Sequence, residues 1–165
     1  MHDLLQMGAR AGELLKARGE RIAVAESSSG GLISAALLAV PGASQYFTSG
    51  AVVYTGRALK TLLDVSREDI AGLGMRSSSE PYALFLAKRM RERHRVEWAL
   101  SETGAAGPTG NPYGDPAGHT CLAVVSGAIE QARTLRTSSA DRSANMWAFA
   151  EAALALLVAN LEAKA

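Results

Sequence analysis

In the N-terminal part of the chain, hydrophobic positions follow first a helical and then a strand-like spacing. Leucines and alanines recur three or four residues apart over 3–18, with charged residues off that stripe, which predicts an amphipathic helix. The run RIAVAE at 21–26 predicts a strand, and serines and glycines follow it. An apolar helix is expected over 32–40, because Pro41-Gly42 comes next.

The middle of the chain alternates in the same way. Residues 46–55 are rich in β-formers and predict a second strand. A short helix is expected over 57–63, and a capping box at 66–69 opens another. The segment 77–81, with serine caps and a proline, predicts a longer helix that runs to about residue 93.

The C-terminal half contains three more strands and one more helix. A strand at 96–102 is followed by a long loop over 103–118 that is rich in Gly, Pro and Asn. Strands at 119–126 and 129–137 form a hairpin, and a closing helix is expected to end near residue 161. Helices that alternate with strands, followed by a hairpin, predict an α/β domain whose mixed sheet is covered on both faces.

Composition restricts the class of protein. The 165 residues predict one domain, 1–165, and the formal charge of +1 argues against a dedicated partner such as nucleic acid or a membrane surface. Cys121 is the only cysteine, which excludes an internal disulfide and fits a cytoplasmic location. The N-terminus lacks the apolar core of a signal peptide, and the apolar tract 152–161 is too short to cross a bilayer.

Two Gly-rich segments that follow strands could carry chemistry. The turn 26–31 (ESSSGG) offers three hydroxyls as nucleophiles and helix-start amides for an anion. An ordinary helix-capping turn explains the same residues equally well. The segment 103–108 also follows a strand, where α/β sheets usually bind ligands, although a flexible surface loop is the alternative.

The charged segments and the histidines give weaker signals. Arg142 at the start of the last helix could bind a phosphate, or could form a surface ion pair with Asp141. The arginines of 89–95 do not form one helical stripe, which favours a solvated helix end over nucleic-acid binding. The three histidines are too scattered in the sequence to predict a metal site.

Taken together, the motifs resemble the C-terminal domain family of the competence/damage-inducible protein CinA, found alone as the nicotinamide-nucleotide amidase PncC. The family motifs have counterparts here in the same order: A-E-S-C-T-G-G as AESSSGG (25–31), P-G-(S/A)-S-x-x-F as PGASQYF (41–47), V-x-Y-S-N-x-x-K as VVYTGRAL (52–59), S-G-I-A-G-P within ETGAAGP (102–108), P-x-G-T as PAGH (116–119) and G-D-R as ADR (140–142). The resemblance covers nearly the whole chain.

The resemblance implies a three-layer α/β/α fold and hydrolysis of nicotinamide mononucleotide to nicotinate mononucleotide and ammonia. It implies no metal or organic cofactor, a small-molecule nucleotide as substrate, and a homo-oligomer. The family's serine nucleophile corresponds to Ser27 and its tyrosine to Tyr54. The implied substrate-binding positions, which include the phosphate site and the nucleotide pocket, are Ser29, Gly30, Gly31, Thr103, Gly104, Ala105, Gly107 and Arg142.

One departure from the family pattern affects the chemistry directly. The position of the family lysine is Leu59 here, and leucine cannot accept a proton. Lys60 is the next residue and is the remaining candidate base, although on a helix its side chain points about 100° away. Lesser departures are Ser28 for cysteine and Gly56 for asparagine. The sequence thus predicts an amidase with Lys60 as the base, a nucleotide-binding member without hydrolysis, or an enzyme for another amide or ester.

Overall fold

The computed structural model describes residues 2–127 and 129–163. Its helices and strands follow the expected order: α1 (His2–Arg18), β1 (Ile22–Glu26), α2 (Leu32–Leu38), the short 3-10 helix η1 (Ala43–Gln45), β2 (Phe47–Val52), α3 (Gly56–Leu63), α4 (Arg67–Gly72), α5 (Glu80–His94), β3 (Trp98–Ala105), β4 (His119–Val125), β5 (Glu130–Arg136) and α6 (Arg142–Ala163).

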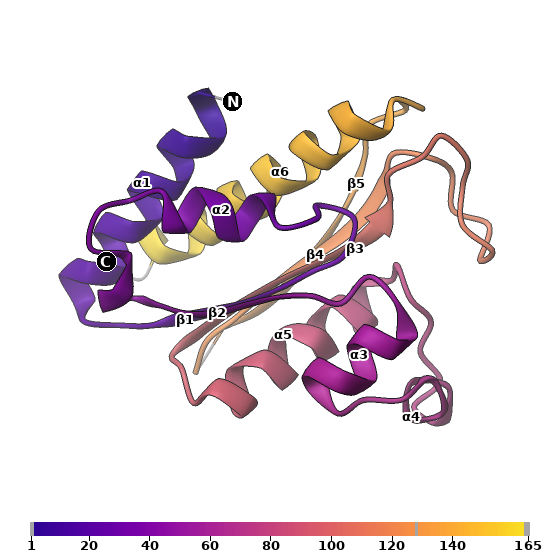
Figure 1. Ribbon diagram of the computed structural model, residues 1–165, viewed down its shortest axis with the longest axis horizontal. Helices are drawn as coiled ribbons and strands as arrows, with labels where there is room; N and C mark the ends of the chain where they lie inside the picture. The colour runs from indigo at the N-terminus through magenta and orange to yellow at the C-terminus, as the bar shows by residue number, and fades with distance from the viewer. Residues whose placement is uncertain (1, 128, 164–165) are drawn as a thin grey trace.

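A five-stranded mixed sheet forms the middle layer, with strand order β2-β1-β3-β4-β5. The strands β2, β1 and β3 are parallel, and β4 and β5 complete the sheet in antiparallel fashion. Helices α1, α2 and α6 cover one face, and α3, α4 and α5 cover the other (Figure 1). The α/β/α fold predicted from the sequence is therefore confirmed.

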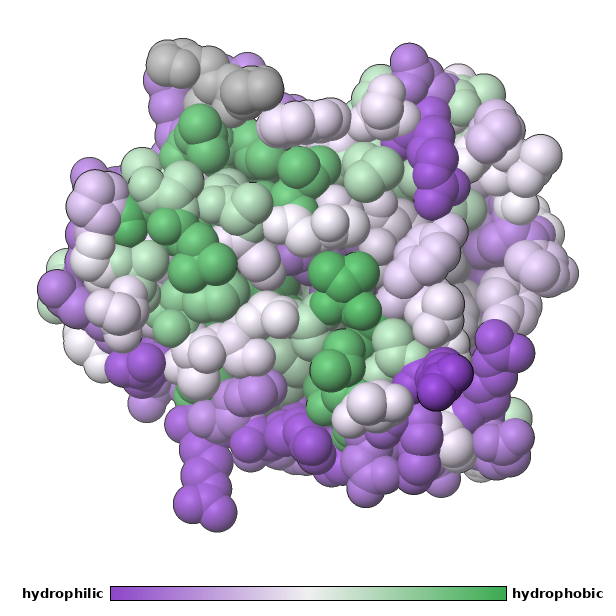
Figure 2. Space-filling model, viewed as in Figure 1, coloured by the Kyte–Doolittle hydropathy of each residue, from purple (hydrophilic) through white to green (hydrophobic). Residues whose placement is uncertain are grey.

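The central strand β1 explains why the core divides into two halves. All five of its residues are buried, as expected for a parallel strand covered on both faces. Ile22 and Val24 belong to the cluster under α1, α2 and α6, whereas Ala23 and Ala25 belong to the cluster under α5. In Figure 2, hydrophobic residues gather over the α1 and α2 side, and hydrophilic residues lie along the opposite edge.

The strand β3 is longer than the sequence predicts. It continues through Thr103 and Gly104 to Ala105, which lies opposite His119 of β4, so the loop begins at residue 106. A glycine permits this pairing, because a Cβ at position 104 would lie 2.5 Å from the carbonyl oxygen of His119. The site residues 103–105 are therefore held on the sheet and not on a mobile loop.

The helix α6 is also longer than the apolar tract that the sequence indicates. It has 22 residues and is long and apolar enough to cross a membrane by length and composition alone. Its apolar side chains, including Phe149, Leu154, Leu157 and Leu161, are buried in the core. α6 therefore serves as a core helix of the α/β/α fold.

Candidate functional site

A cavity of about 510 Å³ opens where β1 and β3 end, beneath α3 and α4. Parallel strands bring their carboxyl ends to the same edge, and ligands of α/β proteins usually bind there. Ser27 and Gly104 both line the cavity, so these two segments meet at its wall. Thr103 lines it too, whereas Ala105 and Gly107 do not.

The turn after β1 places Ser27 at the cavity through two contacts to β3. The backbone N–H of Ser27 donates a hydrogen bond of 3.1 Å to Oε2 of Glu102. The hydroxyl of Ser28 donates a bond of 2.7 Å to the carbonyl oxygen of Gly104. Ser27 itself is half-buried in the cavity wall. Its position is therefore fixed by its neighbours before any ligand binds.

The start of α2 is occupied by a carboxylate of the protein itself. Oε2 of Glu26 accepts hydrogen bonds from the Ser29 hydroxyl (2.9 Å) and the Gly31 amide (2.9 Å), and Oε1 accepts from the amide and hydroxyl of Ser34. The amide of Gly30 donates to the carbonyl oxygen of Ser27. The structure therefore does not bring Ser29, Gly30 or Gly31 to the cavity as a phosphate site.

A second buried carboxylate, Glu102, lies on the other side of the Ser29 hydroxyl. Its Oε2 accepts from that hydroxyl at 2.9 Å and from the Ser29 amide at 2.8 Å. The hydroxyl of Thr120 donates to Oε1 at 2.8 Å. Burial raises the pKa of Glu102, while these hydrogen bonds oppose the shift. The sequence does not indicate Glu26 and Glu102 as a pair, because their hydrogen-bond partners are dispersed along the chain.

Tyr54 and Arg142 form one unit at the cavity rim. Tyr54 lines the cavity, and Arg142 donates a hydrogen bond of 3.0 Å to its hydroxyl. The guanidinium also donates to the carbonyl oxygen of Gly107 at 2.7 Å and lies 6.0 Å from the centre of the Tyr54 ring. Arg142 is not a lining residue, so it holds Tyr54 and the loop after β3 in place.

The helix α3 separates Leu59 from Lys60, as the helical rotation predicts. Leu59 is 4% exposed and lines the cavity. The Lys60 ammonium lies outside it, 2.6 Å from a carboxylate oxygen of Asp64, and its side chain is 58% exposed. The hydrogen bond to Asp64 raises the pKa of Lys60. The expectation that Lys60 serves as the base is therefore not supported by its position or its protonation.

The lining of the cavity lacks a proton acceptor that works near neutral pH. Among the described residues that line it, none is Lys, His, Asp, Glu or Cys. Hydroxyl groups, including those of Ser27 and Thr103, the amide of Asn111 and two arginines supply its polarity. Within residues 2–127 and 129–163, no three His, Cys, Asp or Glu side chains are placed to hold a metal ion.

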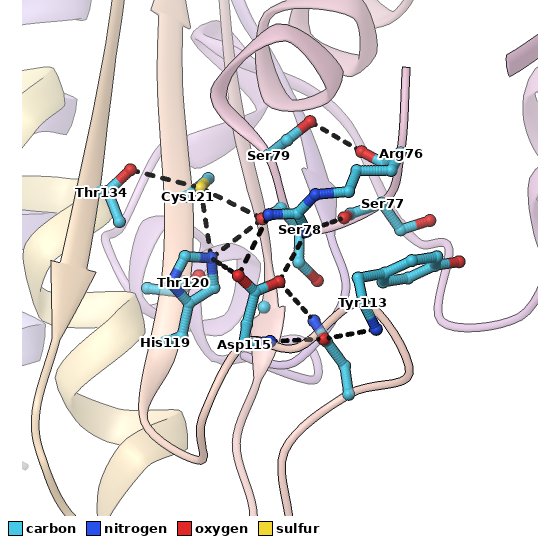
Figure 3. Close-up of polar contacts among 12 residues, drawn as sticks. Arg76, Ser77, Ser78, Ser79, Tyr113, Asp115, His119, Thr120, Cys121 and Thr134 are labelled. Carbon is cyan, nitrogen blue, oxygen red and sulfur yellow. Dashed lines mark hydrogen bonds and ion pairs between the residues drawn. The ribbon is translucent and has the colours of Figure 1, made fainter. Parts of the chain in front are cut away.

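Sequence reasoning missed the two arginines, Arg67 and Arg76. Arg76 binds both carboxylate oxygens of Asp115, at 2.6 and 3.1 Å, and its guanidinium carbon lies 5.7 Å from the centre of the Tyr113 ring (Figure 3). The Arg76 guanidinium lowers the pKa of Asp115. No single motif could have revealed the ion pair of Arg76 and Asp115, because these two residues are 39 positions apart in the sequence.

Behind this ion pair, His119 and Cys121 of β4 fix the turn before α5. Nε2 of His119 lies 2.9 Å from the carbonyl oxygen of Ser78, and the Cys121 thiol donates to the same oxygen. Figure 3 shows these side chains converging on Ser78 behind Arg76 and Asp115. Burial raises the pKa of the Cys121 thiol. These residues therefore support the cavity wall without lining it.

Comparison with known proteins indicates one family. The family model of the CinA C-terminal domain matches residues 5–161. A CinA-like protein of Chloroherpeton thalassium is 40% identical over 149 residues, which is 88% of this chain and 35% of that protein. A CinA-like protein of Chlorobium phaeobacteroides is 40% identical over 151 residues, with the same coverage. The chain thus spans about a third of the length of the curated relatives it matches.

Two solved structures extend the comparison to the fold. A competence-damaged protein (CinA) superfamily protein from Klebsiella pneumoniae superposes with a TM-score of 0.85 at 26% identity, covering 96% of this chain and 98% of that one. The competence/damage inducible protein CihA from Agrobacterium tumefaciens gives a TM-score of 0.86 at 30% identity, covering 97% and 96%. The sequence and the fold together assign this chain to the CinA C-terminal domain family.

Proposed function

We propose that this chain binds nicotinamide mononucleotide, or a closely related phosphorylated pyridine nucleotide, and hydrolyses its carboxamide slowly or not at all. One observation carries the proposal: the cavity retains Ser27 and Tyr54 but has Leu59 where the family pattern has lysine. A volume of about 510 Å³ is within the usual range for small-molecule sites.

The missing base limits hydrolysis because a serine hydroxyl is a weak nucleophile. It attacks an amide only when a neighbouring group takes its proton, and losing that group commonly lowers the rate by several orders of magnitude. Arg67 and Arg76 line the cavity but cannot take this role, since a guanidinium does not lose its proton in proteins. Binding, in contrast, needs only shape, hydroxyls and positive charge, all of which the cavity provides.

A second candidate, the nicotinamide-nucleotide amidase itself, is favoured by the placement of Ser27 and Tyr54. Both line one cavity, and Arg142 holds the Tyr54 hydroxyl by a hydrogen bond of 3.0 Å. In this candidate the Ser27 oxygen bonds to the carboxamide carbon while its proton passes, through the Tyr54 hydroxyl or water, to the amide nitrogen, which leaves as ammonia. Water then hydrolyses the resulting ester, which releases the nicotinate product and restores the Ser27 hydroxyl.

The two candidates are separated by measuring binding and turnover on the same preparation. Calorimetric titration gives the affinity for nicotinamide mononucleotide, and ammonia release gives turnover, with Ser27→Ala as the control. We expect micromolar binding with little ammonia release in the wild type. Rapid release that Ser27→Ala abolishes favours the amidase, and an absence of binding contradicts both candidates.

We also propose a cytoplasmic location and a homo-oligomeric state. The single cysteine is free and buried, which suits a reducing compartment. The oligomeric state follows from the family resemblance alone, and light scattering on the purified protein tests it.

A further inference from the structure

Arg67, the first residue of α4, lies at the cavity with its guanidinium over the start of α3. A Cβ on Gly56 would lie 2.5 Å from Nε of Arg67 and 3.3 Å from its Cδ and Cζ atoms. The Arg67 side chain therefore fills the space that any larger residue at position 56 would need. The glycine, which replaces the family's asparagine, makes this placement of Arg67 possible.

Arg67 differs from the other two arginines near the cavity in its partners. The two terminal nitrogens of Arg76 donate hydrogen bonds to the carboxylate of Asp115. Arg142 donates to the carbonyl oxygen of Gly107 and to the hydroxyl of Tyr54. Within the part of the chain that the structure describes, the Arg67 side chain has neither a carboxylate partner nor a hydrogen bond. Arg67 lines the cavity and is exposed, so its guanidinium donors are available to a ligand.

The chemistry of this group selects an oxyanion as its partner. A guanidinium keeps its charge at all working pH values and binds phosphate or carboxylate through two parallel hydrogen bonds. The neighbouring wall is apolar, with Leu59 and Ile70 both buried, whereas Arg67 itself is exposed, so solvent screens part of its attraction for an anion. The amides of Ser29–Gly31, the alternative phosphate site, are already bonded to the protein itself.

We propose that Arg67 binds the phosphate of the nucleotide and makes the cavity selective for phosphorylated over unphosphorylated nucleosides. This inference rests on the proposed function, namely that the cavity binds a phosphorylated pyridine nucleotide. Arg67 supplies charge and geometry but takes no proton, so it does not restore the missing base.

The test compares two ligands that differ only in the phosphate. Nicotinamide mononucleotide and nicotinamide riboside are titrated calorimetrically into the wild type, Arg67→Ala, Arg67→Lys and the control Arg57→Ala. Arg57 is an exposed arginine on α3 that does not line the cavity, so it reports the general effect of removing one charge.

We expect Arg67→Ala to weaken mononucleotide binding about 10- to 100-fold, the usual value of a hydrogen bond to a charged group, and to leave riboside binding unchanged. Arg67→Lys is expected to retain part of the affinity, and Arg57→Ala nearly all of it. Equal weakening for both ligands, or no weakening for either, overturns the assignment of Arg67.

Failure of the proposed function gives a different result. If the wild type binds neither nucleotide, that function is contradicted, and inorganic phosphate then tests the anion site separately. An NMR titration with millimolar phosphate should shift the Arg67 Nε–H resonance in the wild type and in Arg57→Ala. The absence of that shift overturns the phosphate site itself.

Discussion

The ammonium group of Lys60 lies 2.6 Å from the carboxylate of Asp64, on the side of α3 that faces away from the cavity. The pair is exposed, and such pairs contribute little to stability. We therefore expect Lys60→Ala to leave nucleotide affinity and ammonia release unchanged within experimental error. Calorimetry and an ammonia assay check this, with Asp64→Ala as the matched control. Loss of turnover in Lys60→Ala alone would show that Lys60 reaches Ser27.

Leu59→Lys is expected to raise ammonia release at least 10-fold over the wild type. Position 59 lines the cavity, and the apolar wall with two nearby arginines lowers the pKa of an amine there, so that part of it is neutral. Because Leu59 is buried, the same change should cost about 1–3 kcal/mol of stability. Turnover and denaturant unfolding are measured on one preparation.

Leu59→Met is the control for this substitution, since it keeps an apolar side chain of similar volume. It should leave turnover at the wild-type level and cost less stability than Leu59→Lys. A well-folded Leu59→Lys protein that binds the nucleotide but releases no more ammonia than Leu59→Met contradicts the role assigned to the missing base.

Glu102 should make stability depend on pH. Burial raises its pKa above the ordinary value of 4.5, so the folded protein keeps this proton at pH values where the unfolded chain has released it. Its contribution to stability is present below pH 4.5 and is lost as the pH rises through the raised pKa. We expect Glu102→Gln to become more stable relative to the wild type as the pH rises through the pKa of Glu102.

Glutamine fits this site because its amide can donate to the Thr120 hydroxyl, which in turn lies 3.2 Å from the carbonyl oxygen of Thr103. Thermal unfolding from pH 4.5 to pH 8 measures the difference between the two proteins. Glu13→Gln, a change at an exposed glutamate on α1, should leave the profile unaltered. A constant difference between wild type and Glu102→Gln across this range would mean that Glu102 is ionised throughout.

Gly56→Ala should act on nucleotide binding through Arg67. The added Cβ would lie 2.5 Å from Nε of Arg67 and must displace that side chain. We expect weaker binding of nicotinamide mononucleotide and little further loss when Arg67→Ala is added. A double-mutant cycle measures this, because two changes that act through one contact are not additive. Additive effects would separate Gly56 from the phosphate site.

Periodicity predicts the fold well because each element carries its own local signal. Three signals are readable without tertiary knowledge: the apolar run 22–25 of β1, the serine and proline at the start of α5, and the turn between β4 and β5. The end of β3 is not, because Gly104 has low strand propensity and opens a run of small residues, so this segment becomes a strand only by pairing with β4.

The candidate site is predictable only where a motif carries it. Ser27 belongs to the Gly-rich turn after β1 and Gly104 to the Gly-rich motif at the end of β3, and both line the cavity. Arg67 belongs to no recognisable motif. Its side chain reaches the cavity only because α4 packs over Gly56 in the folded protein. The Glu26 carboxylate accepts hydrogen bonds from amides at the start of α2. The sequence does not predict this role, because a glutamate at the end of a strand is not a recognised helix-capping signal.

The close packing of Arg67 on Gly56 couples these two positions. With the family pattern's asparagine at position 56, the added side chain would occupy the space that the Arg67 side chain now fills. The residue at position 56 therefore sets which conformations an arginine at position 67 can adopt, although the two positions lie on different helices.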